Sequence, residues 1–395
     1  MGYTHDVNEI VDVAVVGAGP AGSAAALRVL QLRPDARVLL LDAAAFPRDK
    51  TCGDGIAAHV LDLLDALGVP DLTPLGPEVP RLRLRSPGGR VVARTCARPN
   101  RVIPRAVFDE RLVAAAVDRG AELRRHRVRA IDVRGDHVVL DGDIAARVVI
   151  GADGANSVVR RLLGAPRTPP NGTAVAIRGY APTALEPDAL LIEFARGRYP
   201  AYAWSFPLLG GGSNVGFGVF DRRGGGSRQE LLDQLDALLP GQVPDPATVR
   251  GHHLPLSTAP RHHPDGRVLL VGDAASMVNP LTGEGIFDAV ASGVLAGRAA
   301  LLGSGAGGAH RAAMRRTFGR HQGHLAVLAR LVPHGRFLDA AVAAADRHQP
   351  VFDAAVDLGL GRGTASRYTL LRVAQSYMTL GRSPGAERQT LGRTA

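Results

Sequence analysis

Cysteine, lysine and aromatic residues are scarce in this sequence, and a long apolar run is absent. The two cysteines, Cys52 and Cys96, are too few for a disulfide framework. No stretch of about 18 apolar residues is present to span a bilayer, and no signal-like segment precedes the first apolar run. We therefore expect a cytoplasmic protein, for which peripheral contact with a membrane remains open.

Basic residues outnumber acidic ones, and almost all of them are arginines. The formal net charge is +10, and the 47 basic residues comprise one lysine, Lys50, and hence 46 arginines. The densest basic cluster, residues 124–129, lies in a short strand-like piece without interleaved aromatic residues that could stack on bases. This pattern favours a solvated sheet edge, so we expect no nucleic-acid partner.

Two histidine pairs, at residues 252–253 and 262–263, are the only sequence feature that suggests a metal. Neighbouring residues of a strand point to opposite faces, and no acidic or cysteine partner keeps a ligand spacing. We therefore expect no metal site.

The feature around which the chain is organised is its first apolar run, which breaks into glycines and then into a helical stretch. Gly17 permits a sharp turn, Gly19 permits close approach of a pyrophosphate, and Gly22 permits close packing of helix on strand. The next predicted strand ends at Asp42, the spacing at which a carboxylate binds an adenosine ribose. This context predicts a dinucleotide site.

Two later strands also end in glycine and an acid. Gly151-Ala-Asp153-Gly154 follows one of them, and Gly272-Asp273 follows the other. Ligands of such sheets collect beyond the carboxyl ends of the strands. A helix then begins near Gly283-Glu284-Gly285-Ile286, and its N–H groups and positive end would stabilise negative charge on a reduced flavin.

The only lysine lies in a run from Phe46 to Gly55. It marks a site that needs a compact ammonium group, or it is a lysine that has been kept by chance in a chain whose other basic residues are arginines. Gly53 and Gly55 flank Asp54, which suggests close approach to a flat ligand, although Asp54 would serve equally well as a helix N-cap.

Residues 171–256 have the alternation of an antiparallel sheet, within which Tyr202, Trp204 and Phe206 share one face. That face is either packed core or the wall of a ligand pocket. Beyond residue 302 the pattern is helical, with two further segments that run from Phe337 and from Thr364, and it indicates either core or a lid over a lipid pocket.

Two motif matches lack the structural context that they need. Gly303 to Gly308 fits G-x-G-x-x-G but follows a helix rather than a strand, so we expect a flexible loop there. Gly381 to Gly385 fits the nucleophile elbow but lies in a polar tail with no strand-to-helix turn around it, which argues against a hydrolase.

The predicted fold class is α/β (α+β), a Rossmann-like nucleotide-binding domain with an inserted antiparallel sheet and C-terminal helices. The expected domains are a discontinuous nucleotide-binding domain, a substrate domain, a helical region and a flexible tail. The nucleotide-binding domain comprises residues 1–75, 101–170 and 266–302, and the substrate domain comprises residues 76–100 and 171–265. The helical region is 303–380, and the flexible tail is 381–395.

Together these segments resemble flavoproteins of the p-hydroxybenzoate hydroxylase fold, and within them the geranylgeranyl-reductase-like family that includes menaquinone side-chain reductases. The resemblance spans most of residues 11–302. It rests on the glycine motif with Asp42, on FPRDKTCGDG, on Arg105, on Gly151 to Gly154 and on VGDAASMVNPLTGEGI. The most specific match is Tyr202-x-Trp204-x-Phe206-Pro207, followed after eight residues by Gly216-x-Gly218.

The resemblance implies FAD as cofactor, with Asp42 at the ribose, Asp273 at the ribityl chain and residues 283–286 at the isoalloxazine rim. It also implies an apolar substrate against Tyr202, Trp204, Phe206 and Phe217, with Cys52, Asp54 and Tyr202 as candidate proton donors. The full implied cofactor set is Gly17, Gly19, Pro20, Ala21, Gly22, Asp42, Arg48, Lys50, Cys52, Gly53, Asp54, Gly55, Arg105, Asp153, Gly154, Gly272, Asp273, Pro280, Gly283, Glu284, Gly285 and Ile286.

The reaction implied by the family is reduction of isoprenoid double bonds, by a hydride from flavin N5 and a proton. No second strand-anchored dinucleotide motif is present, so we expect NAD(P)H or a ferredoxin-type donor to bind transiently. The sequence leaves the oligomeric state open.

The main rival is a monooxygenase that hydroxylates or epoxidises a natural product, because Asp153-Gly154 and Gly272-Asp273 occur there too. Against it, Ser276 replaces its usual histidine and Gly-Glu-Gly-Ile replaces its usual Gly-x-Gly-x-Asn. Tyr202 and Phe206 disfavour a halogenase. A non-catalytic lipid escort of this fold would lack the intact flavin segments that this chain retains.

Overall fold

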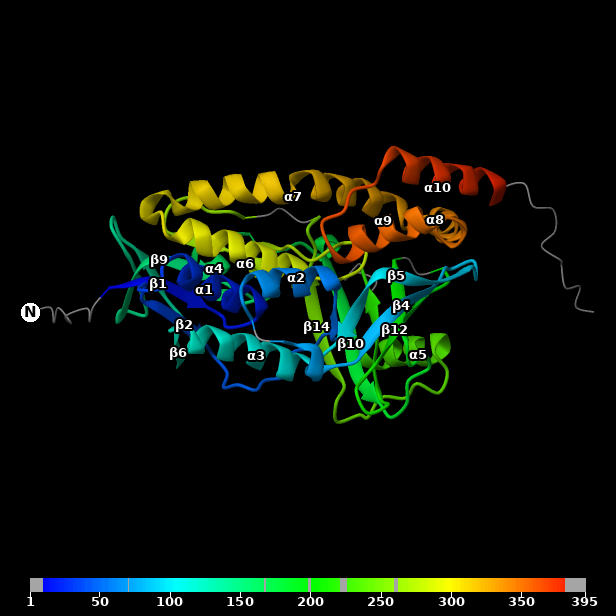
Figure 1. Ribbon diagram of the computed structural model, residues 1–395, viewed down its shortest axis with the longest axis horizontal. Coiled ribbons are helices and arrows are strands. Elements are labelled where there is room, and N and C mark those ends of the chain that lie inside the picture. Colours follow the sequence, from blue (N-terminus) through cyan, green and yellow to red (C-terminus); the bar gives the residue numbers. More distant parts are fainter. Residues whose placement is uncertain are drawn as a thin grey trace, which may run out of the picture.

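The computed structural model describes residues 10–69, 71–166, 168–197, 200–220, 226–258 and 262–380. Two sheets lie side by side along the long axis, and the C-terminal helices cover one long side of the molecule (Figure 1). The predicted flexible tail, residues 381–395, and the elbow-like motif within it lie outside the described residues.

The first sheet is a mainly parallel sheet built from the segments predicted to bind a nucleotide. Its strands run in the order β6-β2-β1-β9-β8-β7, and β15 also pairs with β9 in parallel. β1 and β2 are apolar because parallel strands are covered on both faces. The bounds are β1 Val11–Val16, β2 Val38–Asp42, β6 Glu122–Arg125, β7 Ile131–Val133, β8 Val138–Leu140, β9 Ile144–Gly151 and β15 Val268–Leu270.

Helices cover this sheet and begin near its carboxyl edge. α1 packs along α6 closely enough that a Cβ on Gly293 would lie 2.2 Å from Ala21 O. The helices associated with this half are α1 Pro20–Leu32, α2 Ala58–Ala66, α3 Arg105–Asp118, α4 Val158–Leu162 and α6 Ile286–Ala300.

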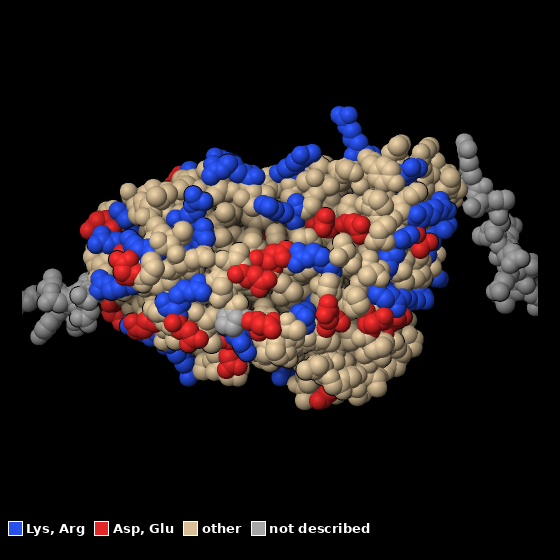
Figure 2. All heavy atoms as spheres, viewed as in Figure 1, with Lys and Arg blue, Asp and Glu red and all other residues tan. Residues whose placement is uncertain are grey.

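The basic cluster begins in β6, an exposed edge strand of the first sheet. On the face drawn in Figure 2, acidic and basic side chains are mixed over the surface rather than gathered by sign. The excess of arginine therefore does not form a single basic patch on that face.

The second sheet combines strands from two distant parts of the chain. Its order is β14-β10-β13-β12-β11-β4-β5-β3, antiparallel except for the parallel pair β11 and β4. That parallel pair joins the early hairpin to the later strands. The bounds are β3 Gly55–Ile56, β4 Glu78–Arg85, β5 Val91–Val102, β10 Thr173–Ala181, β11 Ala189–Phe194, β12 Ala201–Pro207, β13 Ser213–Val219 and β14 Arg250–Pro255.

The two faces of the second sheet have different partners. On one face, Ala203 and Phe217 pack with Leu231 and Leu235 of α5 (Arg228–Leu238) in one buried apolar cluster. The other face carries Tyr202 and its alternate neighbours, which line a cavity described below. The alternation of the strand thus separates core from cavity.

The C-terminal region is more helical than the sequence pattern predicted. The predicted loop at 303–308 is wrong, because a short 3-10 turn at Gly303–Gly305 leads directly into α7 at Ala306. The segment predicted from Phe337 is two helices, because the chain leaves helical geometry at His348 and Pro350 lies in the first turn of the next helix. The bounds are α7 Ala306–Leu331, α8 Gly335–Arg347, α9 Gln349–Leu360 and α10 Arg367–Leu380.

None of the helices in the described residues is both long enough and apolar enough to cross a membrane.

Candidate active site

A first cavity, of about 370 Å³, lies at the carboxyl ends of β1, β2 and β9. Ligands of open α/β sheets collect at this edge. Its lining contains half of the residues expected to bind the cofactor, namely Gly17, Gly19, Pro20, Ala21, Asp42, Arg48, Lys50, Arg105, Asp153, Gly154 and Asp273.

The glycines of the first turn occupy places that admit no side chain. Gly17 has a φ of +102°, and a Cβ on it would lie 2.3 Å from Ala152 O. A Cβ on Gly22 would lie 1.8 Å from Gly17 O, so helix and strand pack in direct contact. No side chain caps the N-terminus of α1, which leaves its first N–H groups available to an anion.

The carboxylates of Asp42 and Asp153 border this cavity, and both accept hydrogen bonds from backbone N–H groups. Asp42 Oδ2 accepts a hydrogen bond from Ala18 N at 3.0 Å. Arg48 contacts both Asp42 and Asp109, at 3.4 and 3.2 Å. Asp153 accepts bonds from Ser157 Oγ and from two N–H groups at the start of α4, and burial raises its pKa.

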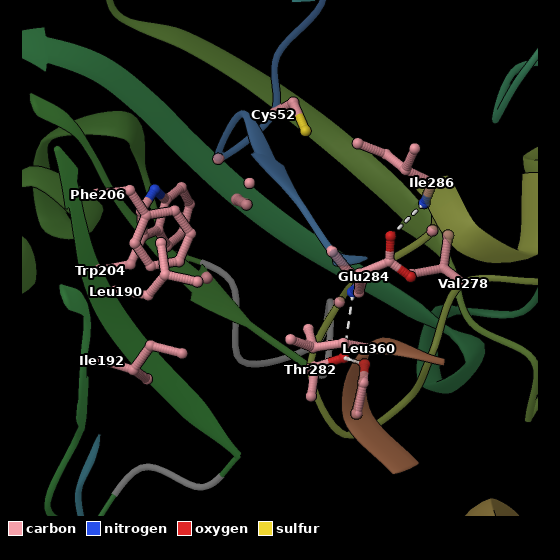
Figure 3. A pocket seen from close by; sticks show the side chains of 18 of the residues that line it. Cys52, Leu190, Ile192, Trp204, Phe206, Val278, Thr282, Glu284, Ile286 and Leu360 are labelled. Atoms are coloured by element: carbon pink, nitrogen blue, oxygen red, sulfur yellow. Dashed lines mark hydrogen bonds between the residues drawn. The ribbon is translucent and has the colours of Figure 1, made fainter. Parts of the chain in front are cut away.

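A second cavity, of about 280 Å³, adjoins the first and lies between the second sheet, the 278–286 loop and the C-terminal helices (Figure 3). The two cavities share Pro20, Lys50, Arg105, Asp273 and Ala289 in their walls. The two cavities therefore adjoin along these five residues.

The second cavity has a polar end and an apolar arm. The polar end contains Lys50, Arg105, Arg178, His252 and Asp273. The arm runs between the sheet and helices α8 and α9, and its walls include Leu82, Leu84, Leu190, Ile192, Ala345, Phe352, Val356 and Leu360.

The only lysine of the chain lies where the two cavities meet. Lys50 Nζ is 3.1 Å from Asp273 Oδ2. Burial acts to raise the pKa of Asp273, but Lys50 and His252 outweigh it, and the net pKa is lowered. Burial, followed by repulsion from Lys50, lowers the pKa of His252 to about 4. At neutral pH the polar end thus holds an ion pair beside a neutral imidazole.

Arg178 anchors the loop that carries Lys50 and Cys52. Its guanidinium is fully buried and donates to the carbonyl oxygens of Cys52 and Lys50, at 3.2 and 3.1 Å, and to Asp49 Oδ1. Sequence reasoning missed this residue. The signal was the alternation of Ala174, Ala176 and Arg178, which places small residues and one arginine on the cavity face of β10.

Asp54 does not line either cavity, contrary to its expected place beside the flavin or as a proton donor. Its φ is +61°, and its carboxylate accepts hydrogen bonds from Arg105 N, Tyr180 Oη and Asn214 Nδ2, at 3.2, 2.8 and 2.7 Å. It does not cap α2, which begins at Ala58. Asp54 instead holds the first N–H group of α3.

The aromatic face of β12 forms a cavity wall rather than core. Tyr202, Trp204 and Phe206 all line the second cavity. A Cβ on Gly53 would lie 3.2 Å from Phe206 Cε2, so this glycine lets the cofactor loop approach the wall. Phe217 corrects an expectation: it pairs with Ala203 in register and therefore lies on the opposite face, in the cluster with α5.

Cys52 and Tyr202, the other expected proton donors, both line the cavity. Burial raises the pKa of the Cys52 thiol, although Arg105 opposes it. Burial also raises the pKa of Tyr202, whose hydroxyl donates to Thr282 O. Both groups are therefore neutral and weakly acidic in this structure.

The start of α6 and the loop before it differ from expectation in two respects. Gly283, Glu284, Gly285 and Ile286 line the cavity as expected, but Gly272 and Pro280 line neither cavity. The N–H groups of Ile286 and Phe287 are occupied by Glu284 Oε1, at 2.6 and 2.9 Å. The side chain of Glu284 thus occupies the place at the N-terminus of α6 where an anion would bind, because its carboxyl group can reach the N–H groups of the helix that follows it.

Within the part of the chain that the structure describes, no three His, Cys, Asp or Glu side chains gather in a way that could hold a metal ion.

The first cavity fits FAD. Gly17 and Gly22 let helix and strand pack in direct contact, the N-terminus of α1 has no side-chain cap, and Asp42 and Asp153 lie beyond the ends of the strands. A family model described as an FAD binding domain matches residues 10–200. Fold and site define an FAD-binding oxidoreductase of the p-hydroxybenzoate hydroxylase type, in which a nucleotide sheet adjoins a curled antiparallel sheet.

The chain belongs to the geranylgeranyl reductase family of these flavoproteins. It is 34% identical over 314 residues to the menaquinone reductase of Mycolicibacterium smegmatis, covering 73% of this chain and 76% of that one. It is 36% identical over 311 residues to digeranylgeranylglycerophospholipid reductase 1 of Methanopyrus kandleri, covering 73% and 80%.

Solved structures give the same fold. A geranylgeranyl bacteriochlorophyll reductase-like protein from Thermoplasma acidophilum superposes with a TM-score of 0.79 at 21% identity, over 94% of this chain and 97% of that one.

Proposed function

We propose that this chain is an FAD-dependent reductase that saturates carbon–carbon double bonds in an isoprenoid chain. The observation that carries the proposal is that the nucleotide cavity adjoins the cavity with the apolar arm and shares wall residues with it. The names of the relatives support it, since they are reductases of a menaquinone and of a geranylgeranyl lipid. An external donor, NAD(P)H or a ferredoxin-type protein, would supply the electrons.

Bound FAD, once reduced, would supply a hydride to one carbon of the double bond. The chain's own residues would do the rest. Trp204, Phe206 and Leu190 exclude water and hold the apolar chain flat against the sheet. Lys50 and Arg105 lie at the boundary of the two cavities, where they would neutralise negative charge on the cofactor.

The proposal is tested by reducing the purified FAD-loaded protein without oxygen and mixing it with polyprenyl substrates or with aerated buffer. We expect the flavin spectrum to return to the oxidised form with the alkene alone, and the product to be saturated. Reoxidation only by dioxygen, with an oxygen atom inserted in the product, would establish the monooxygenase instead. A protein that cannot be loaded with FAD would favour the lipid escort.

The length of the apolar arm sets a prediction for substrate size. Ala345 lies in the buried cluster that contains Leu82 and Leu190, and it lines the arm. Ala345→Phe should fill the arm, at a cost in stability of about 1–3 kcal/mol. We expect KM to rise about tenfold or more for a long polyprenyl substrate and little for a short one.

The matched control is Ala341→Phe, one turn earlier on the same helix, which does not line the cavity. It should leave the ratio of the two KM values unchanged. Equal effects of both variants would show that the arm does not hold the substrate.

A further inference from the structure

Glu284 lies in the cavity wall at the start of α6. It stands across the second cavity from Trp204 and Phe206 (Figure 3). Its hydrogen bonds from the N–H groups of Ile286 and Phe287 both go to Oε1. Within the described residues no hydrogen bond engages Oε2, so this oxygen remains available to carry a proton.

The other acids near the cavity are poorly placed to give up a proton. Among the described residues that line the second cavity, the carboxyl groups are those of Asp273 and Glu284. Asp273 is paired with Lys50, which helps to keep it ionised. The hydroxyl of Tyr202 donates a hydrogen bond to Thr282 O, and burial makes the thiol of Cys52 less acidic. Glu284 is the carboxyl group left to hold a transferable proton.

The surroundings of Glu284 set its proton affinity near neutrality. Burial raises its pKa to about 7, the two N–H bonds oppose this, and Asp273 adds to the rise. Asp288, one turn further on, has its pKa raised by burial and then by Glu284 and Asp273. Tyr202 faces Glu284 from β12 and is neutral. General acids work best when the pKa lies near the working pH.

We propose that Glu284 is the general acid that protonates the carbon–carbon double bond as the hydride is delivered. This rests on the reductase function proposed above. An unactivated alkene resists hydride, so a proton must lead or accompany it, from an acid held away from water.

The step balances with this residue alone on the protein side. The O–H bond at Oε2 breaks, and its proton takes the π pair to form a C–H bond at one carbon. The other carbon accepts a hydride pair, so the alkene gains two electrons, which bound reduced FAD would supply. Glu284 is left as a carboxylate, which the N–H groups of Ile286 and Phe287 and the positive end of α6 stabilise. Solvent restores the proton between turnovers.

The test compares Glu284→Gln with Asp288→Asn in the FAD-loaded protein. Glutamine keeps an oxygen for the helix N–H groups but has no transferable proton. We expect anaerobic reoxidation by the alkene to slow about 100-fold or more in Glu284→Gln, with FAD content retained. In the wild type this rate should fall as pH rises through about 7, since the acid form is the active one. Asp288 does not line the cavity, so Asp288→Asn should keep that rate and its pH profile.

An independent readout uses the flavin-free protein. The infrared carbonyl band of a protonated carboxyl group should titrate near pH 7 in the wild type and in Asp288→Asn, and should be missing in Glu284→Gln. The proposal is overturned if Glu284→Gln reduces the alkene at the wild-type rate, or if the carbonyl band titrates in that variant as it does in the wild type. Either result leaves the reductase function standing. A wild-type protein that reduces no isoprenoid overturns the proposed function itself.

Discussion

Replacing Gly22 with valine should abolish FAD binding and destabilise the fold by more than about 4 kcal/mol, a large share of a typical stability of about 5–15 kcal/mol. A Cβ at this position would lie 1.8 Å from Gly17 O and 3.1 Å from Val15 Cγ1. Neither neighbour can move away easily, because Gly17 is held in the turn and β1 lies between β2 and β9. α1 would have to leave the sheet, together with its phosphate-binding end.

The measurement is the urea midpoint of unfolding and the FAD retained per chain after gel filtration. Gly319→Ala is the matched control, since this glycine of α7 has no atom within 4 Å of a Cβ. Alanine there should stabilise the protein by up to about 1 kcal/mol. A Gly22→Val protein that unfolds at the wild-type midpoint would show that helix and strand need not touch.

Asp54→Leu should cost about 3–5 kcal/mol and release the cofactor loop. The buried carboxylate accepts from three groups that no longer have an acceptor after the change, and each unpaired group costs about 1–3 kcal/mol. A leucine would also be strained at a φ of +61°. We expect most of the variant to lose FAD, as measured by absorbance per chain, and to unfold at a lower urea concentration.

Asp54→Asn distinguishes this anchoring role from proton donation. Asparagine tolerates the left-handed conformation and keeps one acceptor oxygen. Its reduction rate should stay within about tenfold of the wild type, with a loss of stability of about 1–3 kcal/mol. A variant of normal stability and FAD content that no longer reduces the alkene would place Asp54 in the proton path.

The nucleotide half was readable from the sequence because its signals are local. The glycine turn and the acid at the end of β2 are each specified by a few neighbouring residues, and the structure places them around one cavity. Their chemistry follows from backbone geometry, which a short motif can dictate. The curled second sheet was likewise indicated by alternation of residues within its strands.

The errors arose where the answer depends on pairing between distant strands. Alternation shows that Tyr202 and Trp204 share a face, but only the register of β12 with β13 decides the face of Phe217. Asp54 finds Tyr180 and Asn214 more than a hundred residues away. Neither contact leaves a trace in the local sequence.

The loop before α6 is tied to the last part of the chain that lines the second cavity. Asn279 Nδ2 donates to the carbonyl oxygen of Leu358 at 3.0 Å, and Thr282 Oγ1 donates to that of Gly359 at 2.8 Å. Among the described residues, the last one that lines the nucleotide cavity is Ala289, whereas the arm needs residues up to Leu360, which are made 71 positions later (360 − 289).

This layout gives the growing chain an order of assembly. Ribosomes add about 5–20 residues per second, so every residue that lines the nucleotide cavity is made several seconds before the arm can close. A nascent chain can therefore take up its cofactor, and be stabilised by it, while the second cavity is still open on one side. Supply of FAD during synthesis would then govern the yield of folded enzyme.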